Sequence, residues 1–289
     1  MRQTIDLTWA SIRMLLRDSE AILFAGIAPV LFLLVFSLYD LSVTVGGDLA
    51  TGTAGGSVSY FDFVLPGMLA MGLMNFTMVG IAGSVARYRE TQVLRRLMAT
   101  PVSPLAFLTG QVMARLALSV GQVLLLLVVG LLLGGTVAGN ALVVVTLAVL
   151  GNLTFLALGF AIAGRTSTVD AANNLAGLAT LPLMFLSGMF FPLAALPDSV
   201  RAVAEWLPIT PLIEGMRAVA LDGVGLAALG TELALLAGWV LVSFTLARLS
   251  FRMGPRDTRL RRWGTRAASV PVEPEPVGTA AERRQALLT

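Results

Sequence analysis

The chain has 289 residues, of which 56% are hydrophobic and 13% are charged, about half the charged share of an average soluble domain. It contains no cysteine and no histidine, and all 20 basic residues are arginine. This excludes disulfides and thiolate metal sites and removes the usual general base and zinc ligand. The apolar residues form runs of about 20, the length that crosses the hydrocarbon core of a bilayer. We therefore expect an all-α integral membrane protein, with arginines that serve topology and anionic lipid rather than nucleic acid.

The N-terminal segment predicts a helix that lies on the membrane surface. Residues 2–20 place apolar side chains at helical spacing and arginines on the other side, a pattern typical of an interfacial helix. The apolar stripe is Ile5, Trp9, Ile12 and Leu16, and the arginines are Arg13 and Arg17. A solvated lead-in helix is the alternative interpretation. A signal peptide is not indicated, because the apolar run starts late and no small-residue cleavage site follows it.

Six apolar runs predict six membrane-spanning helices. They lie at about residues 21–39, 63–85, 116–133, 141–163, 175–195 and 226–247. With both ends of the chain in the cytoplasm, 18 of the 20 arginines lie inside, and only Arg201 and Arg217 lie outside. In this count Arg115 marks the cytoplasmic end of the third span. The asymmetry predicts a multi-pass protein of the cell inner or plasma membrane with cytoplasmic N- and C-termini.

The second span carries a methionine stripe. Met68, Met71, Met74 and Met78 recur at helical spacing, and Asn75 lies beside them at mid-membrane. Methionine stripes usually provide adaptable packing, whereas the alternative is a wall that meets apolar substrates of varied shape. Asn75 needs a polar partner at this depth, which a substrate or a helix–helix hydrogen bond can supply.

The segment after the fifth span predicts a break near the outer surface. Gly188, Pro192 and Pro197 cannot all continue a regular helix. Two short amphipathic helices follow, at 198–206 and 212–221, and each is too short to cross the membrane. We expect Asp198 to be a helix N-cap, Gly223 to be a helix stop, and Glu214 to pair with Arg217. Together these features predict a re-entrant or surface hairpin on the external side.

The polar stretch at 86–104 lies between the second and third spans and carries four arginines and Glu90. Val93, Leu94, Leu97 and Met98 form an apolar strip on a short helix. Thr100–Pro101 ends that helix, and Ser103–Pro104 begins the next, with proline in the first turn. The alternative is an ordinary cytoplasmic loop that follows the positive-inside rule. Such a loop needs arginines, but it needs neither an apolar strip nor helix start and stop signals. We therefore expect a cytoplasmic coupling helix joined to the second and third spans.

The chain resembles the membrane subunit of ABC-2 type exporters and is similar to drug-resistance permeases of the daunorubicin type. The resemblance rests on FVLPGMLAMGL (63–73), RYRETQVLRRLMATPVSPL (87–105), and FLSGMFFPLAALP (185–197) followed by LPITPLIEGMR (207–217). The family's cytoplasmic segment often reads E-x-G-T-L-x-R-L-x-x-T-P, and this chain departs from it at Gln92 and Val93. The resemblance assigns residues 1–253 to the transmembrane domain. We expect residues 254–289 to form an Arg-rich and then disordered cytoplasmic tail.

The resemblance implies a half-transporter that works with a separate cytoplasmic ABC ATPase and a second permease subunit, in a homodimer or heterodimer. ATP and Mg belong to the partner, because this chain has no G-x-x-x-x-G-K-[ST] motif and no lysine; no cofactor or metal is expected here. The implied ATPase-coupling residues are Arg89, Glu90, Val93, Leu94, Arg96, Leu97, Thr100 and Pro101. The implied substrate path is lined by Met71, Met74, Asn75, Met78, Phe185, Met189 and Phe190. Glu90 is the expected charged contact of the docking surface, against the alternative of a solvated glutamate.

The leading hypothesis is a permease that exports drug-like, antibiotic or lipid-like amphipathic molecules with energy from the partner ATPase, and that is not itself an enzyme. A secondary transporter driven by an ion gradient is the alternative. It needs midplane ionisable groups, but Asp62 and Glu232 lie near span ends. A membrane-embedded hydrolase ranks below both, because no catalytic set of side chains is evident.

Overall fold

The computed structural model describes residues 2–17, 26–38, 59–93 and 104–250. All regular elements within these ranges are helices, and five of them are long and apolar enough to cross a membrane. The all-helical membrane architecture is therefore confirmed. Of the first predicted span, only α3 (Ala28–Leu38) is described. Residues 39–58, most of the coupling segment and the tail lie outside the described residues.

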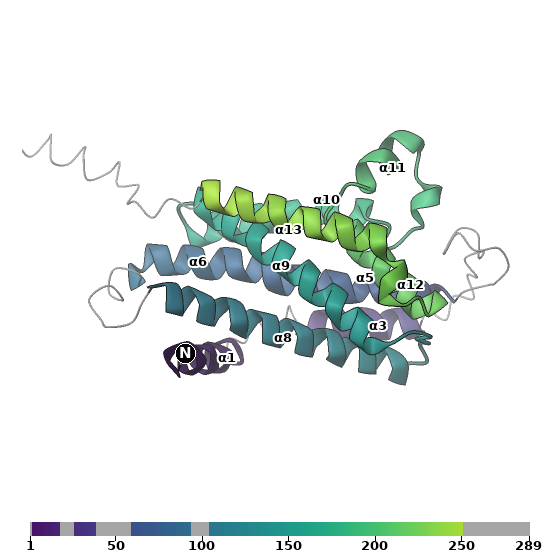
Figure 1. The fold of residues 1–289 in the computed structure, drawn as a ribbon, viewed down its shortest axis with the longest axis horizontal. Coiled ribbons are helices and arrows are strands. Elements are labelled where there is room, and N and C mark those ends of the chain that lie inside the picture. The colour runs from purple at the N-terminus through teal and green to yellow at the C-terminus, as the bar shows by residue number, and fades with distance from the viewer. Residues whose placement is uncertain (1, 18–25, 39–58, 94–103, 251–289) are drawn as a thin grey trace, which may run out of the picture. The chain divides into compact units, whose positions relative to one another are not determined.

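The central helix is the second predicted span, which is longer than expected. It consists of α5 (Tyr60–Met74), the π-helix η2 (Asn75–Val79) and α6 (Gly80–Glu90), which run as one helix. Apart from Asp62 in its first turn, α5 is apolar on all sides, so it can be surrounded by other helices. α5 packs against α3, α8, α9 and α12, whereas α6 packs against α9 and α10. In Figure 1 α5 and α6 run through the middle of the helices.

The next two spans flank this central helix. α8 (Pro104–Leu132) begins with a proline in its first turn, as expected. Its span starts well before the predicted residue 116. α9 (Ala141–Arg165) is capped by Asn140, whose Oδ1 accepts a hydrogen bond from the Leu142 N–H at 2.8 Å. α1 (Arg2–Leu15) lies along α8.

The fifth span begins earlier than predicted. α10 (Val169–Leu186) is capped by Thr168, whose hydroxyl accepts from the Ala171 N–H at 3.2 Å. Thr168, rather than its neighbour Ser167, is therefore the cap of this helix, and residues 169–174, before the predicted start at 175, are helical. The chain breaks after α10 at Gly188, which adopts a positive φ of 75° that glycine tolerates without strain.

Beyond the break, both predicted short helices are present. They are α11 (Asp198–Ala204) and α12 (Thr210–Asp222), and α13 (Gly230–Ser250) follows as the last span. Gly223 stops α12 in a left-handed conformation with φ of 66°, as expected. The N-cap prediction for Asp198 is wrong: Pro197 occupies the cap position and Asp198 is the first helical residue. α11 and α12 lie at the end of the helices opposite Glu90.

Candidate functional site

The last two residues of α6 attach the central helix to its neighbours. The Arg89 guanidinium donates a hydrogen bond to the carbonyl of Ala163 at 2.7 Å, in the last turn of α9. The Glu90 carboxylate accepts one from the backbone N–H of Val169 at 3.3 Å, in the first turn of α10. A helix carries partial negative charge at its C-terminus and partial positive charge at its N-terminus. Each side chain therefore meets the helix end of opposite charge. We call this arrangement the Arg89–Glu90 bridge.

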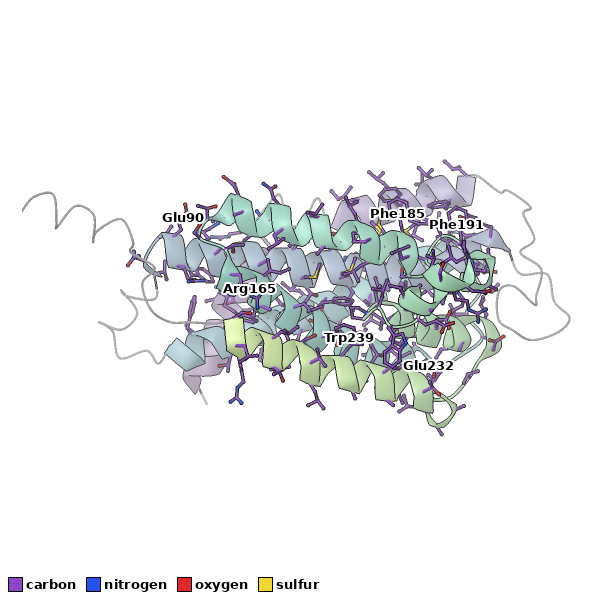
Figure 2. The ribbon with its side chains drawn as sticks, turned by 90° about the horizontal axis from the view of Figure 1, so that it is seen from above. Glu90, Arg165, Phe185, Phe191, Glu232 and Trp239 are labelled. Atoms are coloured by element: carbon purple, nitrogen blue, oxygen red, sulfur yellow. The ribbon has the colours of Figure 1, made fainter. Side chains whose placement is uncertain are left out.

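The bridge joins three spans at one end of the molecule. The connection between α9 and α10 is short, only residues 166–168, so it ties their two ends closely together. Figure 2 places Glu90 and Arg165 on the same side, away from Phe185 and Glu232. Glu90 remains exposed, so its carboxylate can also meet a partner. The expected docking role of Glu90 stays a prediction, and its contact within the chain is new.

The backbone turns immediately after the bridge. Thr91 caps α6, and Gln92 adopts a left-handed conformation with φ of 57°. A left-handed residue directly after a helix is most often glycine, which explains why glycine is common here in the family pattern that the sequence resembles. Val93 is half-buried. The other expected coupling residues, Leu94, Arg96, Leu97, Thr100 and Pro101, lie outside the described residues.

Most of the methionines expected on the substrate path are enclosed within the chain. Met74, Met78 and Met189 have at most 1% of their surface exposed. Their burial favours the packing interpretation. Met71 and Asn75 are only half-buried. The Asn75 side chain donates to the carbonyl of Met71 at 3.1 Å, one turn back on its own helix, and within the described part of the chain it has no hydrogen bond to another helix.

An aromatic cluster lies at the end opposite Glu90. The rings of Phe185 and Phe190 are 5.9 Å apart, and Phe36 of α3 packs against Phe190 at 6.3 Å and against Tyr60 at 5.9 Å. The Tyr60 hydroxyl donates to the carbonyl of Phe190 at 3.2 Å. Phe185 is 57% exposed, and Figure 2 shows it at the end away from Glu90. The cluster thus combines the exposed ring of Phe185 with three half-buried rings. Sequence reasoning missed Phe36 and Tyr60, although aromatic residues at span ends are typical of membrane interfaces.

Arg217 anchors α12 to the central helix. Its side chain is only 4% exposed and donates to the carbonyls of Gly188 at 2.9 Å and Phe63 at 3.4 Å. Its guanidinium carbon also lies 3.8 Å from the centre of the Phe63 ring, a cation–π contact. Burial lowers the pKa of Arg217 to about 10, so the side chain remains charged at neutral pH. The expected ion pair with Glu214 is wrong: among the described residues, the ion pair on these short helices joins Arg201 to Glu205.

These features define the chain as a multi-pass helical membrane protein whose spans are linked by buried or bridging charges. Residues 2–221 match the ABC-2 type transporter family, and the chain belongs to that family. It is also similar to the linearmycin resistance permease protein LnrN of Bacillus subtilis (strain 168). The two are 28% identical over 147 residues, which cover 51% of this chain and 38% of that protein.

Proposed function

We propose that the chain is the permease subunit of an ATP-binding cassette exporter. It moves drug-like, antibiotic or lipid-like amphipathic molecules out of the cell, and a separate ATPase subunit supplies the energy. Membership of the ABC-2 type transporter family supports the class of transporter. The similarity to a protein named a linearmycin resistance permease supports a drug-like substrate.

The proposed topology has six spans with both termini in the cytoplasm. Residues 21–39, which include α3, form the first span, and the five long helices form the others. Arginines gather at the Glu90 end, on α1, on α6 and at the ends of α9 and α13, which supports placing that end in the cytoplasm. α11 and α12 then form the external re-entrant hairpin.

The Arg89–Glu90 bridge is the observation that carries the proposal. A permease without its own nucleotide motif needs a place where an ATPase can push. The coupling segment follows α6 directly, so a displacement of this segment moves Arg89 and Glu90. Through their hydrogen bonds it also moves the ends of α9 and α10. ATP-driven closure of the partner would therefore act on four spans, α6 and α8 through the chain and α9 and α10 through the bridge.

The proposed substrate path lies between two permease subunits, which form either a homodimer or a heterodimer. The exposed edge of Phe185, together with half-buried Phe190, Met71 and Asn75, suits an apolar or amphipathic molecule. The buried side chains of Met74, Met78 and Met189 provide packing inside the chain next to these exposed and half-buried residues. Aromatic and thioether groups adapt to ligands of different shape, which suits a substrate class rather than one compound.

Co-expression with an ABC ATPase tests the proposal. The complex should copurify, and vesicles that contain both proteins should move an amphipathic dye only with hydrolysable ATP. Glu90→Ala and Leu94→Asp variants should still insert into the membrane, but ATPase pairing or ATP-dependent transport should weaken. Transport by the permease alone under a proton gradient would refute the proposal and favour a secondary transporter.

A further inference from the structure

A row of buried polar side chains runs along one face of α8. Gln111, Arg115 and Ser119 have at most 2% of their surface exposed, and Gln122 has 8%. Their spacing of four, four and three residues places them on the same face. The Gln111 amide donates to the Ser11 hydroxyl of α1 at 3.1 Å, and the Asn152 amide of α9 donates to the Ser119 hydroxyl. Arg115 is the charged member of this row.

Arg115, which the sequence placed at the cytoplasmic end of its span, lies inside its helix and not at the helix end. α8 begins eleven residues earlier, at Pro104, and Arg115 points into the packed helices. An ionisable side chain buried within a membrane span is costly, so it indicates a function by default. The hydrogen-bond partners of Arg115 lie on the central helix, and they indicate which part of the protein it acts on.

Arg115 contacts three successive turns of the central helix. It donates hydrogen bonds to the carbonyl of Phe76 at 3.0 Å, to the carbonyl of Gly80 at 2.7 Å and to the hydroxyl of Ser84 at 2.6 Å. Its guanidinium carbon is 5.6 Å from the centre of the Phe76 ring. Gly80 leaves the space for this group, because a Cβ at that position would be only 3.2 Å from the guanidinium carbon.

The contacted segment includes the π-helix η2. π-helices are rare, are usually a single turn within an α-helix, and often occur at functional sites. Their widened turn disturbs the regular pairing of carbonyls with amides. Water is absent from the membrane interior, so protein donors must supply the missing hydrogen bonds. The planar guanidinium offers several donors in a fixed geometry, and Arg115 places them at the carbonyls of Phe76 and Gly80.

A π-turn also sets the relative rotation of the helix before and after it. An α-helix turns about 100° per residue, and a π-turn holds about one residue more than an α-turn. If η2 relaxed to α-helix, α6 would therefore rotate by about 100° relative to α5. Asn75 and Met71 lie at or before the turn, whereas Arg89 and Glu90 lie after it.

We propose that Arg115 is a positioning residue that holds η2 in the π-helical register. It thereby sets the rotation of the Arg89–Glu90 bridge relative to Met71 and Asn75 of the proposed substrate path. The expected effect on transport rests on the proposed function. The register itself is a property of the chain alone. Loss of Arg115 should therefore change which face of α6 meets α10 and uncouple ATP hydrolysis from transport.

Disulfide crosslinking measures this register directly. The chain has no cysteine, so two introduced cysteines report without background. Ala86 of α6 and Ala172 of α10 share one buried cluster and suit such a pair. The pair should crosslink readily when Arg115 is present. With Arg115→Met, the crosslinked fraction should fall at least about tenfold, because the loss of one charge-assisted hydrogen bond already corresponds to about that factor and the variant removes three. Arg115→Lys should restore it only in part, because lysine lacks the planar fork.

Gln111→Met is the matched control, since Gln111 is a buried polar residue in the same row whose side chain binds α1 rather than the central helix. It should leave the Ala86–Ala172 crosslink unchanged. Equal crosslinking in Arg115→Met and Gln111→Met would overturn the inference. If Arg115→Met does not insert, Ser84→Ala decides the question, because it removes a single acceptor: a smaller loss of crosslink supports the inference, and no loss overturns it.

The functional measurement separates this inference from the proposed function. In vesicles with the partner ATPase, Arg115→Met should keep ATP hydrolysis and lose transport per ATP, whereas Gln111→Met should keep both. Failure of the unaltered chain to pair with an ATPase would count against the proposed function and leave the crosslinking result valid. An unchanged transport-to-hydrolysis ratio in Arg115→Met would contradict the positioning role.

Discussion

Gly159 allows α9 to cross the central helix at close range, so replacing it with alanine should separate the two helices. A Cβ at residue 159 would lie 2.6 Å from the carbonyl oxygen and 3.3 Å from the carbonyl carbon of Met78, and it would also contact Ile81. Ordinary carbon–oxygen contacts are about 3.3–3.6 Å. The helices must therefore move apart by about 0.7 Å or more, because a backbone oxygen cannot rotate away as a flexible side chain can.

Two opposing effects determine the size of the change. Overpacking a tight contact costs about 1–3 kcal/mol, whereas alanine in a helix is favoured over glycine by about 0.5–1 kcal/mol. Gly238→Ala in α13 isolates the second effect, because no atom lies within 4 Å of its added Cβ. The difference in the free energy of unfolding between Gly159→Ala and Gly238→Ala should therefore be about 1–3 kcal/mol.

Thermal unfolding of the two purified variants in the same detergent measures this difference. For proteins of similar size, 1 kcal/mol shifts the midpoint by about 2–4 °C, so Gly159→Ala should melt about 2–12 °C below Gly238→Ala. Gly159→Leu should lower the midpoint further. If Gly159→Ala and Gly238→Ala melt together, the close approach of α9 and η2 does not exist as described.

Three further variants test the helix ends and the anchor of the short helices. Gln92→Gly should stabilise the protein by about 0.5–1 kcal/mol, because glycine adopts the left-handed conformation of residue 92 without strain; a lower melting temperature would contradict this. Thr168→Ala should cost about 0.5–2 kcal/mol in the same assay through loss of the α10 cap, whereas Ser167→Ala should have no effect. Arg217→Leu should leave the carbonyls of Gly188 and Phe63 without their donor and speed protease cleavage between α10 and α12. Arg201→Leu, which removes only an exposed ion pair, should not.

The features predicted correctly from the sequence depend on neighbouring residues. Apolar runs indicated the membrane spans because hydrocarbon admits few charges over about 20 residues. Pro104 at the start of α8 and Gly223 after α12 were recognisable because backbone conformation at a helix end depends on the residue that occupies it. The Asp198 cap failed because Pro197 precedes it and takes the cap position. Asp198 then provides favourable charge in the first turn but no cap.

The candidate site depends on contacts that no local pattern specifies. Glu90 was selected from the sequence as a charged contact for a partner, but its hydrogen bond joins it to Val169, 79 residues away. Burial of Met74, Met78 and Met189 likewise depends on the helices that surround α5 and η2, since a methionine stripe looks the same whether it faces protein, lipid or substrate.

The sequence alone determined that this chain is a helical membrane protein and roughly which segments form its long apolar helices, because hydrophobicity acts on each segment independently. Tertiary structure alone decided the partners of Arg89, Arg115 and Arg217. Each guanidinium is placed by a helix and donates to backbone carbonyls of other segments 29–154 residues distant. Every residue has a backbone carbonyl, so the sequence does not indicate which carbonyl will accept the hydrogen bond from a given arginine. Only the packing of the helices brings donor and acceptor together.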